Sequence, residues 1–407
     1  MKCGLLGGKL SHSYSPQIHG FLGTYSYDLF EKEPTELESF LKSGNFTGLN
    51  VTIPYKKSVI PFCAKLSDRA AQLRAVNTIV RQADGSLIGH NTDYFGFSSM
   101  LQRSRLQVSG KKVLVLGSGG ASATAVAVLK EANANVIIIS RTGDNNYGNL
   151  HLHRDAAVIV NTTPVGMYPN VGISPVDIGL FPQLEGVLDL VYNPARTQLL
   201  LDAEARGLTA VNGLWMLVAQ AKESAEWFTG SKISDDKIRY IYNQLRLQME
   251  NIILVGMPGC GKSTIGKMLA EKAGKAFIDA DTVITEQAGM PIPEIFKQSG
   301  EVGFRSWETK VLSQLGKQSG LVIATGGGCV TKPENYPLLH QNGTIVWLQR
   351  DISLLPTDGR PLSQAGKLQD MYAVRQPLYA QFADIVINNN CDPAETVNAI
   401  LSREVKL

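Results

Sequence analysis

The sequence predicts an α/β fold with parallel sheets, spread over two or three domains. Short apolar strands alternate with helical segments along the whole chain, which is typical of α/β proteins. Three sets of such units follow one another, and they begin near the N-terminus, at Lys112 and at Asn251. The chain has 407 residues, which is too long for one hydrophobic core.

The composition predicts an ordinary soluble globular protein. Hydrophobic residues make up 44% and charged residues 18% of the chain, and the formal net charge is +3. This small charge predicts neither a nucleic-acid nor a membrane partner, and the alternative of a nucleic-acid-binding ATPase would need a basic stripe that the sequence lacks. No apolar stretch approaches the ~18 residues that span a bilayer.

Cysteine and histidine usage predicts a reduced, cytoplasmic compartment and no structural zinc site. The five cysteines are scattered and form no C-x-x-C pair,. Glycines interrupt the N-terminus too early for a secretory signal. His151 and His153 have the spacing of a strand, but no third ligand lies nearby in the sequence, so a solvated strand or loop is expected there. The oligomeric state is not predicted.

The run from Gly256 to Ser263 predicts a phosphate-binding loop. It reads GMPGCGKS, follows the apolar strand expected over 252–255 and opens a helix that begins at Thr264. This is the G-x-x-x-x-G-K-S pattern in the strand–turn–helix context that it requires. Lys262 can reach the β- and γ-phosphates of a nucleotide, and the Ser263 hydroxyl can bind Mg²⁺. The candidate nucleotide contacts are Gly256, Gly259, Cys260, Gly261, Lys262, Ser263 and Thr264.

A second glycine-rich turn predicts a dinucleotide site. Gly117-Ser118-Gly119-Gly120-Ala121 follows the strand expected over 112–116 and precedes a helix-like run. Glycines let the backbone approach a pyrophosphate, and the helix N-terminus faces its charge. The next strand ends in Ser140-Arg141-Thr142, where an NAD site would have an acidic residue; Arg141 suits the 2′-phosphate of NADP. The alternative is that Arg141 is a surface loop residue.

Short polar clusters recur through the first half of the chain, at 11–16, 50–56, 75–78 and 91–93. Hydroxyls, amides, one lysine and one aspartate are the groups that a polyhydroxylated acid needs. A lysine–aspartate pair can also move a proton to a carbonyl oxygen while hydride arrives at its carbon. Taken singly, each cluster is also explained by helix caps or solvated turns.

Taken together, these segments resemble shikimate dehydrogenase from about residue 4 to 246. The matching stretches keep their order along the chain, and they are 11–16, 50–56, 75–78 with Asn77, 91–93 with Asp93, 117–122, 161–167, 192–194 and 212–221. The resemblance implies reversible reduction of 3-dehydroshikimate with NADPH. It also implies an α/β substrate-binding lobe, residues 1–97 with 210–248, and a Rossmann-like NADP-binding lobe, residues 98–209.

The same resemblance implies roles for individual residues. Ser13 and Ser15 would hold the substrate carboxylate, and Thr52, Asn77 and Gln220 would hold its hydroxyls. Lys56 and Asp93 would form the acid/base dyad, while Tyr192 and Gly213 would border the nicotinamide. The segment from Arg141 to Asn161 is shorter than in that family, which predicts a trimmed adenine side of the cofactor lobe. A helix is expected over 235–250, and it leads into the third set of units without a flexible linker.

The last part of the chain carries acids and arginines in addition to its phosphate loop. Asp279 and Asp281 share the parity of one strand, so one could serve magnesium while the other faces an acceptor hydroxyl. Arg305, Arg360 and Arg375 suit one carboxylate and several phosphate oxygens. The glycines at 326–328 let backbone amides approach a ligand.

These residues resemble shikimate kinase over 251 to about 403, within a P-loop domain with a parallel sheet at 250–407. By that resemblance Asp281 would orient the substrate hydroxyls and assist deprotonation, and Asp279 would act on Mg²⁺ through its shell. The substrate carboxylate would be bound by Arg305, Arg375 and the backbone at Gly327, and Arg360 would steady the transferring phosphate. The lid segments on either side of Arg360 are several residues short, and the basic residue expected before Gly359 is missing.

The sequence therefore predicts a bifunctional enzyme of aromatic amino-acid biosynthesis. Its first half would reduce 3-dehydroshikimate to shikimate, and its second would phosphorylate the 3-hydroxyl, so that one half makes the substrate of the other. The cofactors would be NADP(H), ATP and Mg²⁺. One alternative is a fusion in which only one half is active. Another is a generic P-loop kinase joined to an oxidoreductase, which gives no reason for the set Asp281, Arg305, Gly327 and Arg375.

Overall fold

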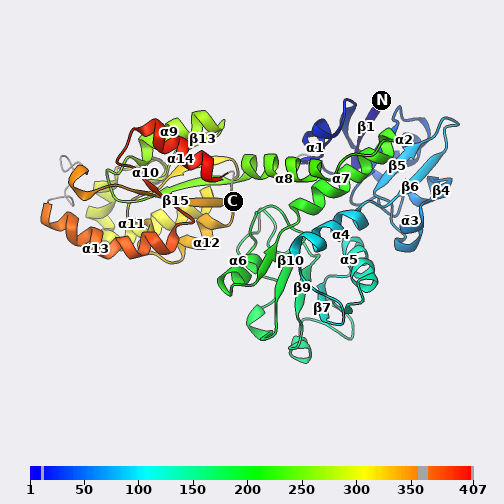
Figure 1. Cartoon of the computed structure of the whole chain (residues 1–407), viewed down its shortest axis with the longest axis horizontal. Helices are drawn as coiled ribbons and strands as arrows, with labels where there is room; N and C mark the ends of the chain where they lie inside the picture. The colour runs from blue at the N-terminus through cyan, green and yellow to red at the C-terminus, as the bar shows by residue number, and fades with distance from the viewer. Residues whose placement is uncertain (11–12, 356–364, 405–407) are drawn as a thin grey trace. The chain divides into compact units, whose positions relative to one another are not determined.

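The structure is a computed structural model that describes residues 1–10, 13–355 and 365–404 (Figure 1). The chain forms two compact units. Unit 1 consists of Met1–Val165, Ser174–Tyr192 and Asp202–Tyr242, and unit 2 of Gly166–Ile173, Asn193–Leu201 and Asn243–Leu407.

The first sheet of unit 1 is mixed, and its strand order is β2-β1-β3-β5-β6-β4. Its strands are β1 (Lys2–Gly7), β2 (Ser26–Glu31), β3 (Gly48–Val51), β4 (Lys65–Leu66), β5 (Thr78–Arg81) and β6 (Leu87–His90). The prediction of parallel sheets throughout is wrong here, because β5 runs antiparallel to both β3 and β6. The connection over 82–86 is short, and such a connection can only form a hairpin.

Helices from distant parts of the chain belong to the same lobe as this sheet. They are α1 (Ser15–Leu22), α2 (Leu37–Ser43), α3 (Asp68–Leu73) and α7 (Leu214–Thr229), with short 3-10 helices at Pro34–Glu36 and Ile60–Phe62. A core that includes Leu6, Leu41, Leu49 and Ile79 fills the space beside the strands. Helix α7 packs against α1 and α4, and so brings residues near 220 beside the N-terminal lobe.

The second sheet of unit 1 is parallel, with strand order β11-β10-β9-β7-β8. Its strands are β7 (Lys112–Leu116), β8 (Asn135–Ile139), β9 (Val158–Asn161), β10 (Gly186–Asp189) and β11 (Thr209–Val211). Helices precede or follow these strands in the sequence, and they are α4 (Asp93–Ser104), α5 (Gly120–Glu131) and α6 (Gln198–Ala205). A 3-10 helix lies at Ile178–Leu180. The strand order reverses at β7, which pairs with β8 on one side and β9 on the other. In open α/β sheets the crevice at such a switch point binds ligands.

The connection from β8 to β9 contains one 3-10 helix, Leu150–His153, among its described residues. This agrees with the predicted shortening of the cofactor lobe. The solvated strand or loop expected around His151 holds only in part: His151 and Leu152 are exposed, but the segment is a 3-10 helix. His153 is buried, and its Nε2 lies 3.0 Å from Oδ1 of Asn145. Local packing therefore accounts for this histidine.

The helix predicted over 235–250 is confirmed as α8 (Asp236–Met249). Its apolar residues at helical spacing, Ile238, Ile241 and Leu245, are buried. In unit 1 the Arg103 guanidinium lies 4.2 Å from the ring centre of Trp215 and 4.7 Å from that of Tyr242. Such cation–π contacts fix the first turns of α8 against α4 and α7.

Unit 2 contains a fully parallel sheet with strand order β13-β14-β12-β15-β16. Its strands are β12 (Asn251–Val255), β13 (Ala276–Asp279), β14 (Leu321–Ala324), β15 (Gly343–Gln349) and β16 (Ile385–Asn388). Its helices are α9 (Lys262–Ala273), α10 (Ala280–Ala288), α11 (Ile292–Gly316), α12 (Asn335–His340), α13 (Ala365–Phe382) and α14 (Pro393–Glu404), with 3-10 helices at Cys329–Thr331 and Ile352–Leu354. The three strands at the centre of the sheet are mostly apolar and are buried along nearly their whole length, as expected for strands that are covered on both faces,.

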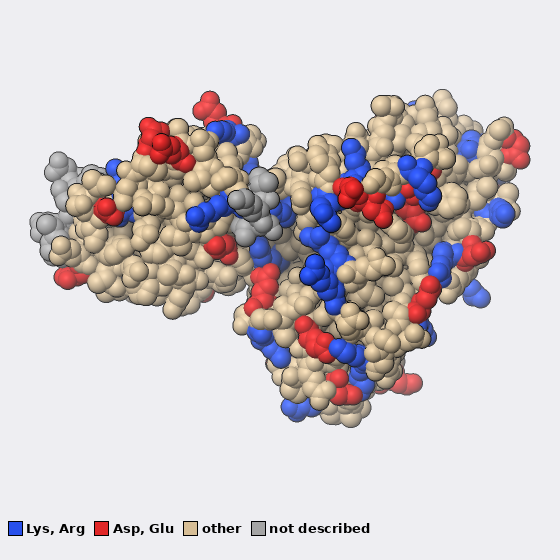
Figure 2. Space-filling model, viewed as in Figure 1, with Lys and Arg blue, Asp and Glu red and all other residues tan. Residues whose placement is uncertain are grey.

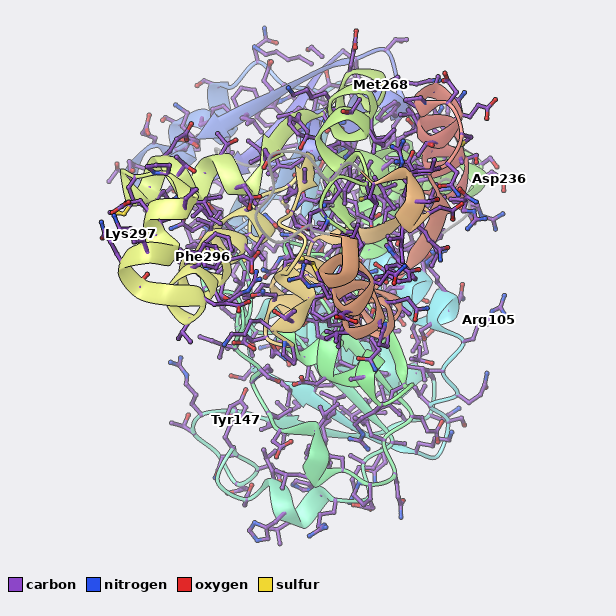
Figure 3. The ribbon with its side chains drawn as sticks, turned by 90° about the vertical axis from the view of Figure 1, so that its left-hand side faces the viewer. Arg105, Tyr147, Asp236, Met268, Phe296 and Lys297 are labelled. Atoms are coloured by element: carbon purple, nitrogen blue, oxygen red, sulfur yellow. The ribbon has the colours of Figure 1, made fainter. Side chains whose placement is uncertain are left out.

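Helix α11 carries apolar side chains on one side and charged side chains on another. Phe296 stacks on Phe304 with ring centres 4.7 Å apart, whereas the neighbouring Lys297 is 79% exposed. Figure 3 shows the two side chains on opposite sides of the helix. The helix is interrupted at Gly300, whose φ of +66° only glycine adopts readily,.

Acidic and basic residues are interspersed on the face seen in Figure 2. Among the described residues, no helix is both long enough and apolar enough to cross a membrane.

Candidate functional site

A cleft of about 330 Å³ in unit 1 collects the polar residues that the sequence assigned to one substrate. Its walls include Ser13, Ser15, Thr52, Lys56, Asn77, Asp93, Ala121, Tyr192, Gly213 and Gln220. These residues come from seven separate stretches of the chain. Folding therefore brings together every catalytic and substrate-binding residue proposed for the first half.

The acid/base pair is formed within this cleft. The Nζ of Lys56 lies 2.6 Å from Oδ2 of Asp93, and the two side chains are 29% and 14% exposed. Lys56 lies on the turn after β3, where its carbonyl accepts a hydrogen bond from the amide of Val76. Asp93 is the first residue of α4, and a helix N-terminus stabilises a carboxylate,. A charged lysine and a charged aspartate can share a proton with a ligand at this position.

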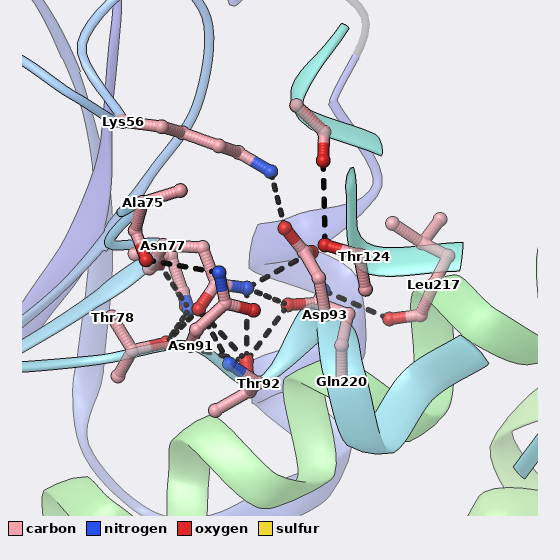
Figure 4. Close-up of polar contacts among 12 residues, drawn as sticks. Lys56, Ala75, Asn77, Thr78, Asn91, Thr92, Asp93, Thr124, Leu217 and Gln220 are labelled. Carbon is pink, nitrogen blue, oxygen red and sulfur yellow. Dashed lines mark hydrogen bonds and ion pairs between the residues drawn. The ribbon is translucent and has the colours of Figure 1, made fainter. Parts of the chain in front are cut away.

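Two amides extend the polar wall beside the dyad (Figure 4). The Nδ2 of Asn77 lies 3.0 Å from Oδ1 of Asp93 and 3.5 Å from Oε1 of Gln220. Gln220 lies on α7, so a helix near the end of unit 1's sequence contributes to the wall of the cleft. Adjacent amide donors and acceptors suit the hydroxyls of a small polyol.

Ser13, Ser15 and Tyr192 also line the cleft. The Ser13 hydroxyl accepts a hydrogen bond of 3.2 Å from the backbone amide of Ser15, the first residue of α1. Tyr192 packs edge-on against Tyr14, with ring centres 6.2 Å apart. Burial raises the pKa of the Tyr192 hydroxyl, and the Tyr14 oxygen adds to this effect. The Tyr192 hydroxyl is therefore neutral and can donate a hydrogen bond to an anionic ligand.

Gly213 is required by its surroundings. A Cβ at this position would lie 2.1 Å from the carbonyl oxygen of Leu190, which also lines the cleft. No larger residue fits there without moving the backbone that leads to Tyr192.

The glycine turn at the switch point of the second sheet has room for a ligand. Gly117 has a φ of +106°, and a Cβ there would meet Thr162 at 2.8 Å. By contrast, nothing lies within 4 Å of a Cβ built on Gly119 or Gly120. Ser118 and Ala121 are exposed, as are these two glycines at the start of α5. Free backbone amides at a helix N-terminus suit a pyrophosphate.

Arg141 and Thr142 lie in the loop after β8, and both are exposed. The structure thus leaves the Arg141 guanidinium accessible at the carboxyl end of the strand beside the glycine turn. It gives no partner carboxylate for this arginine among the described residues.

The phosphate loop of unit 2 has the conformation that its motif predicts. Gly256, Gly259 and Gly261 all have positive φ, at 144°, 83° and 99°. Lys262 folds back over the loop, and its Nζ donates to the carbonyls of Gly256 and Met257 at 2.9 and 3.0 Å. Cys260 is buried and Thr264 lies in the first turn of α9. The ammonium group is thereby held at the centre of the loop.

Sequence reasoning missed a residue that supports this loop. The Nδ2 of Asn389, just after β16, donates to the carbonyl of Cys260 at 2.6 Å, and its Oδ1 accepts from Thr396. The signal available was an asparagine at the carboxyl end of a strand, among neighbours that are also asparagines. Nothing local distinguishes Asn389 from a surface turn residue. In the cleft of unit 1, Asn50, Leu190, Met216 and Leu217 were missed in the same way.

The predicted strand parity of the two aspartates is wrong. Asp279 ends β13 and is the N-cap of α10, whereas Asp281 lies in the first turn of that helix. The Asp279 carboxylate instead bridges Ser263, whose Oγ lies 2.7 Å away, and the amide of Asp281 at 3.1 Å. A strand that ends in Asp is readily followed by a helix that the same residue caps. The hydroxyl and the carboxylate still face each other beside the phosphate loop.

Asp281 is partly buried, and its surroundings suit a proton acceptor. Burial raises the pKa of its carboxyl and the charge of Asp279 raises it further, while Lys262 and Arg305 act in the opposite direction. Its Oδ1 has no hydrogen-bond partner among the described residues. A basic carboxylate with a free oxygen can accept a proton from a substrate hydroxyl.

The arginines of unit 2 approach the glycine triplet. Arg305 is paired with Glu308 at 2.7 Å and with Glu301 at 3.2 Å, and a Cβ on Gly328 would lie 2.1 Å from its guanidinium. Arg375 donates to the carbonyl of Gly327 at 3.3 Å. Both guanidinium groups therefore lie beside the same backbone turn. Arg360, the proposed contact of the transferring phosphate, lies outside the described residues.

Comparison with known proteins matches the two halves separately. The family described as "Shikimate dehydrogenase substrate binding domain" matches residues 5–79, and "Shikimate kinase" matches residues 258–404. The chain is 35% identical to shikimate dehydrogenase (NADP(+)) of Clostridium perfringens (strain SM101 / Type A), over 60% of this chain and 97% of that protein.

Solved structures give the same result for the first half. Shikimate dehydrogenase 1 from Peptoclostridium difficile is 37% identical with a TM-score of 0.56, over 60% of this chain and 98% of that one. A chorismate mutase/shikimate 5-dehydrogenase fusion protein from Clostridium acetobutylicum is 35% identical with a TM-score of 0.57, over 60% of this chain and 96% of that one. The chain belongs to the shikimate dehydrogenase family through its first 60%, and a shikimate kinase domain follows.

Proposed function

We propose that this protein catalyses two consecutive reactions: reduction of 3-dehydroshikimate to shikimate with NADPH, and phosphorylation of shikimate at its 3-hydroxyl with ATP. The observation that carries the proposal is the convergence, in one cleft, of the Lys56–Asp93 pair with groups for a carboxylate and for hydroxyls. The shikimate kinase match of unit 2 supports the second reaction, since its substrate is the product of the first.

In the reductive half, Ser13 and Ser15 bind the substrate carboxylate, and Asn77 and Gln220 bind its hydroxyls. This places the carbonyl oxygen at the Lys56–Asp93 pair, from which Lys56 donates a proton. NADPH, when bound, supplies hydride to the carbonyl carbon. Asp93 holds the Lys56 ammonium at 2.6 Å and lowers the cost of burying its charge,.

The residues present fit NADP. The open space at Gly119 and Gly120 accommodates a pyrophosphate at the α5 N-terminus,. Gly213 and Tyr192 line the cleft and would border the nicotinamide. Arg141 is exposed at the end of β8, where it can pair with a 2′-phosphate,.

In the kinase half, Asp281 accepts the proton of the acceptor hydroxyl, while Arg305 and Arg375 bind the substrate carboxylate. Lys262 leaves the loop carbonyls and neutralises charge on the transferring phosphoryl group. Ser263 and Asp279 fit Mg²⁺, because hydroxyl and carboxylate oxygens are the hard ligands that this ion prefers. The two oxygens lie 2.7 Å apart, so both could contact one bound ion or its water ligands. Mg²⁺ supplies charge neutralisation at the phosphates when it is bound.

Separate initial-rate assays of the full-length protein test this proposal. We expect NADPH oxidation that depends on 3-dehydroshikimate, and ADP formation that depends on shikimate and Mg²⁺. 3-Dehydroquinate serves as the alternative substrate in the first assay. Preference for 3-dehydroquinate over 3-dehydroshikimate would replace the shikimate assignment with a quinate one, and absence of either activity would leave a fusion with one active half.

Arg141 is expected to select NADPH over NADH. A charge-assisted bond to the 2′-phosphate contributes roughly 1.5–3 kcal/mol, or about 10- to 100-fold in kcat/KM. In Arg141→Ala, kcat/KM for NADPH should therefore fall while kcat/KM for NADH stays unchanged, so that most of the preference is lost. Arg154→Ala, which removes another exposed arginine of the same lobe, is the matched control. Equal kcat/KM for both cofactors in the unmodified protein would show that no residue reads the 2′-phosphate.

A further inference from the structure

A network of buried side chains that sequence reasoning did not assign adjoins the proposed dehydrogenase cleft, and its Asn50 also lines the cleft. It consists of Asn50 on β3, Thr78 on β5, Thr92 before α4 and Ser224 on α7. They are 5%, 0%, 1% and 0% exposed, respectively. Four elements therefore meet through polar groups that water does not reach, and each of these groups must find its partner within the protein.

The Ser224 hydroxyl is the centre of this network. It donates to the backbone carbonyl of Gln220 at 2.9 Å, and a carbonyl can only accept,. Its oxygen must then act as acceptor toward its other neighbours, which are Asn50 Nδ2 at 2.8 Å and the hydroxyls of Thr78 and Thr92, each at 2.9 Å. With two lone pairs, it satisfies Asn50 and one threonine.

The backbone fixes the amide of Asn77. The amide N–H of Thr92 donates to Oδ1 of Asn77 at 2.7 Å, so this atom must be the oxygen. The Nδ2 of Asn77 then donates to Oδ1 of Asp93 and to the Thr92 hydroxyl, each at 3.0 Å. Figure 4 shows these contacts converging on Asn77 and Thr92.

One arrangement of protons satisfies the whole network. Thr92 accepts from Asn77 and donates to Ser224. Thr78 accepts from Asn50 at 3.2 Å and donates to Oδ1 of Asn77 at 3.1 Å. The carbonyl of Gln220 fixes the direction at Ser224 and the amide of Thr92 fixes that at Asn77, whereas the Thr92 hydroxyl also lies 3.2 Å from Oδ1 of Asn77 as an alternative acceptor,.

This arrangement determines which hydrogen bonds the Asp93 carboxylate accepts. Its Oδ1 accepts from Asn77 and its Oδ2 from Lys56 at 2.6 Å, so both carboxylate oxygens have a donor. If the Asn77 amide turned over, an oxygen would face the carboxylate, and the Thr92 amide would face a donor. We propose that Thr92 and Ser224 are positioning residues for the dehydrogenase reaction, which hold Asn77 in the orientation that aligns the Asp93–Lys56 pair.

A purely structural role is the competing explanation, because the same bonds also tie α4 and α7 to the first sheet. The two explanations differ in what they predict for turnover. Loss of alignment lowers kcat in a protein that remains folded, whereas loss of a structural tie lowers thermal stability without a specific effect on kcat.

The test compares Thr92→Val and Ser224→Ala with Thr92→Ser in the full-length protein. Thr92→Val keeps the side-chain shape and removes the hydroxyl, and Thr92→Ser keeps the hydroxyl. The matched control is Thr229→Ala, which removes a hydroxyl that donates to a carbonyl four residues earlier on the same helix, just as Ser224 does. Steady-state kcat and KM for shikimate, shikimate kinase activity and thermal unfolding are measured on each preparation.

We expect kcat of the dehydrogenase to fall roughly 10- to 100-fold in Thr92→Val and Ser224→Ala. KM should rise by a smaller factor, Thr92→Ser and Thr229→Ala should stay near the unmodified protein, and kinase activity should be unchanged in all four. A kcat within about twofold of the unmodified protein in both hydroxyl-deleted variants overturns the proposal. So does an equal loss in Thr92→Ser and Thr92→Val, or a loss of kcat that only follows unfolding. The inference rests on the proposed dehydrogenase activity, whose own failure would appear in the unmodified protein.

Discussion

Lys56→Met and Asp93→Asn are each expected to abolish most dehydrogenase turnover. The two side chains form the proton-transfer pair of the cleft, at 2.6 Å from one another. General acid–base catalysis is typically worth about 10²–10⁴-fold, so kcat should fall by that factor in each variant. Initial rates of NADPH oxidation with 3-dehydroshikimate measure the effect.

The control for this prediction is Lys57→Ala, which removes the exposed lysine next to Lys56. It should have normal dehydrogenase activity. Shikimate kinase activity of the same samples should be close to that of the unmodified protein, because no kinase residue proposed above precedes Gly256. A parallel loss of both activities would mean that the substitutions unfold the chain, and the assignment of the pair would lose its support.

Lys262→Met and Asp281→Asn are expected to abolish shikimate phosphorylation for different reasons. Lys262 acts on charge that develops at the transferring phosphoryl group, and loss of one such contact costs about 10²–10³ in kcat. Asp281 acts on the acceptor hydroxyl, so its replacement should cost about 10²–10⁴ in kcat and leave ATP binding intact. Calorimetric titration with ATP separates the two, alongside ADP formation.

Glu286→Gln is the matched control for Asp281→Asn, because Glu286 is an exposed carboxylate on the same helix α10. It should phosphorylate shikimate normally. NADPH-dependent reduction should be unchanged in all three variants. Near-normal phosphorylation by Asp281→Asn would show that another group accepts the proton of the substrate.

The phosphate loop was predictable because its information is local. Eight consecutive residues specify the turn, and the positive φ values of Gly256, Gly259 and Gly261 follow from their being glycines,. The glycine turn at Gly117 follows from the same argument. The substrate-contacting residues of the cleft could be named only through the resemblance to a family, because their sequence clusters are individually explained by caps and turns.

The network around Ser224 could not be predicted, because its members are far apart in the chain. Asn50 and Ser224 are 174 residues apart and 2.8 Å from each other. A single serine in a helix has no sequence signal that separates a buried hub from a solvated side chain. Long-range packing determines whether such a serine is buried, whereas sequence periodicity indicates only which face of the helix is apolar.

Two errors have local physical causes. The antiparallel strand β5 was missed because alternating strands and helices were interpreted as parallel throughout, although the short connection over 82–86 permits only a hairpin,. The parity argument for Asp279 and Asp281 failed because a helix begins between them, with Asp279 as its cap. Aspartate is a common N-cap, so an Asp at a strand end is also a helix-start signal.

The most direct test of the central claim is a single reaction that contains the protein, 3-dehydroshikimate, NADPH, ATP and Mg²⁺. We predict that NADPH is consumed, that ADP forms after shikimate appears, and that shikimate 3-phosphate is the final product by mass spectrometry. Omission of NADPH should prevent both product and ADP, and omission of ATP should stop the reaction at shikimate. Accumulation of shikimate in the complete mixture, with no ADP formed, would contradict the claim that both halves are active enzymes.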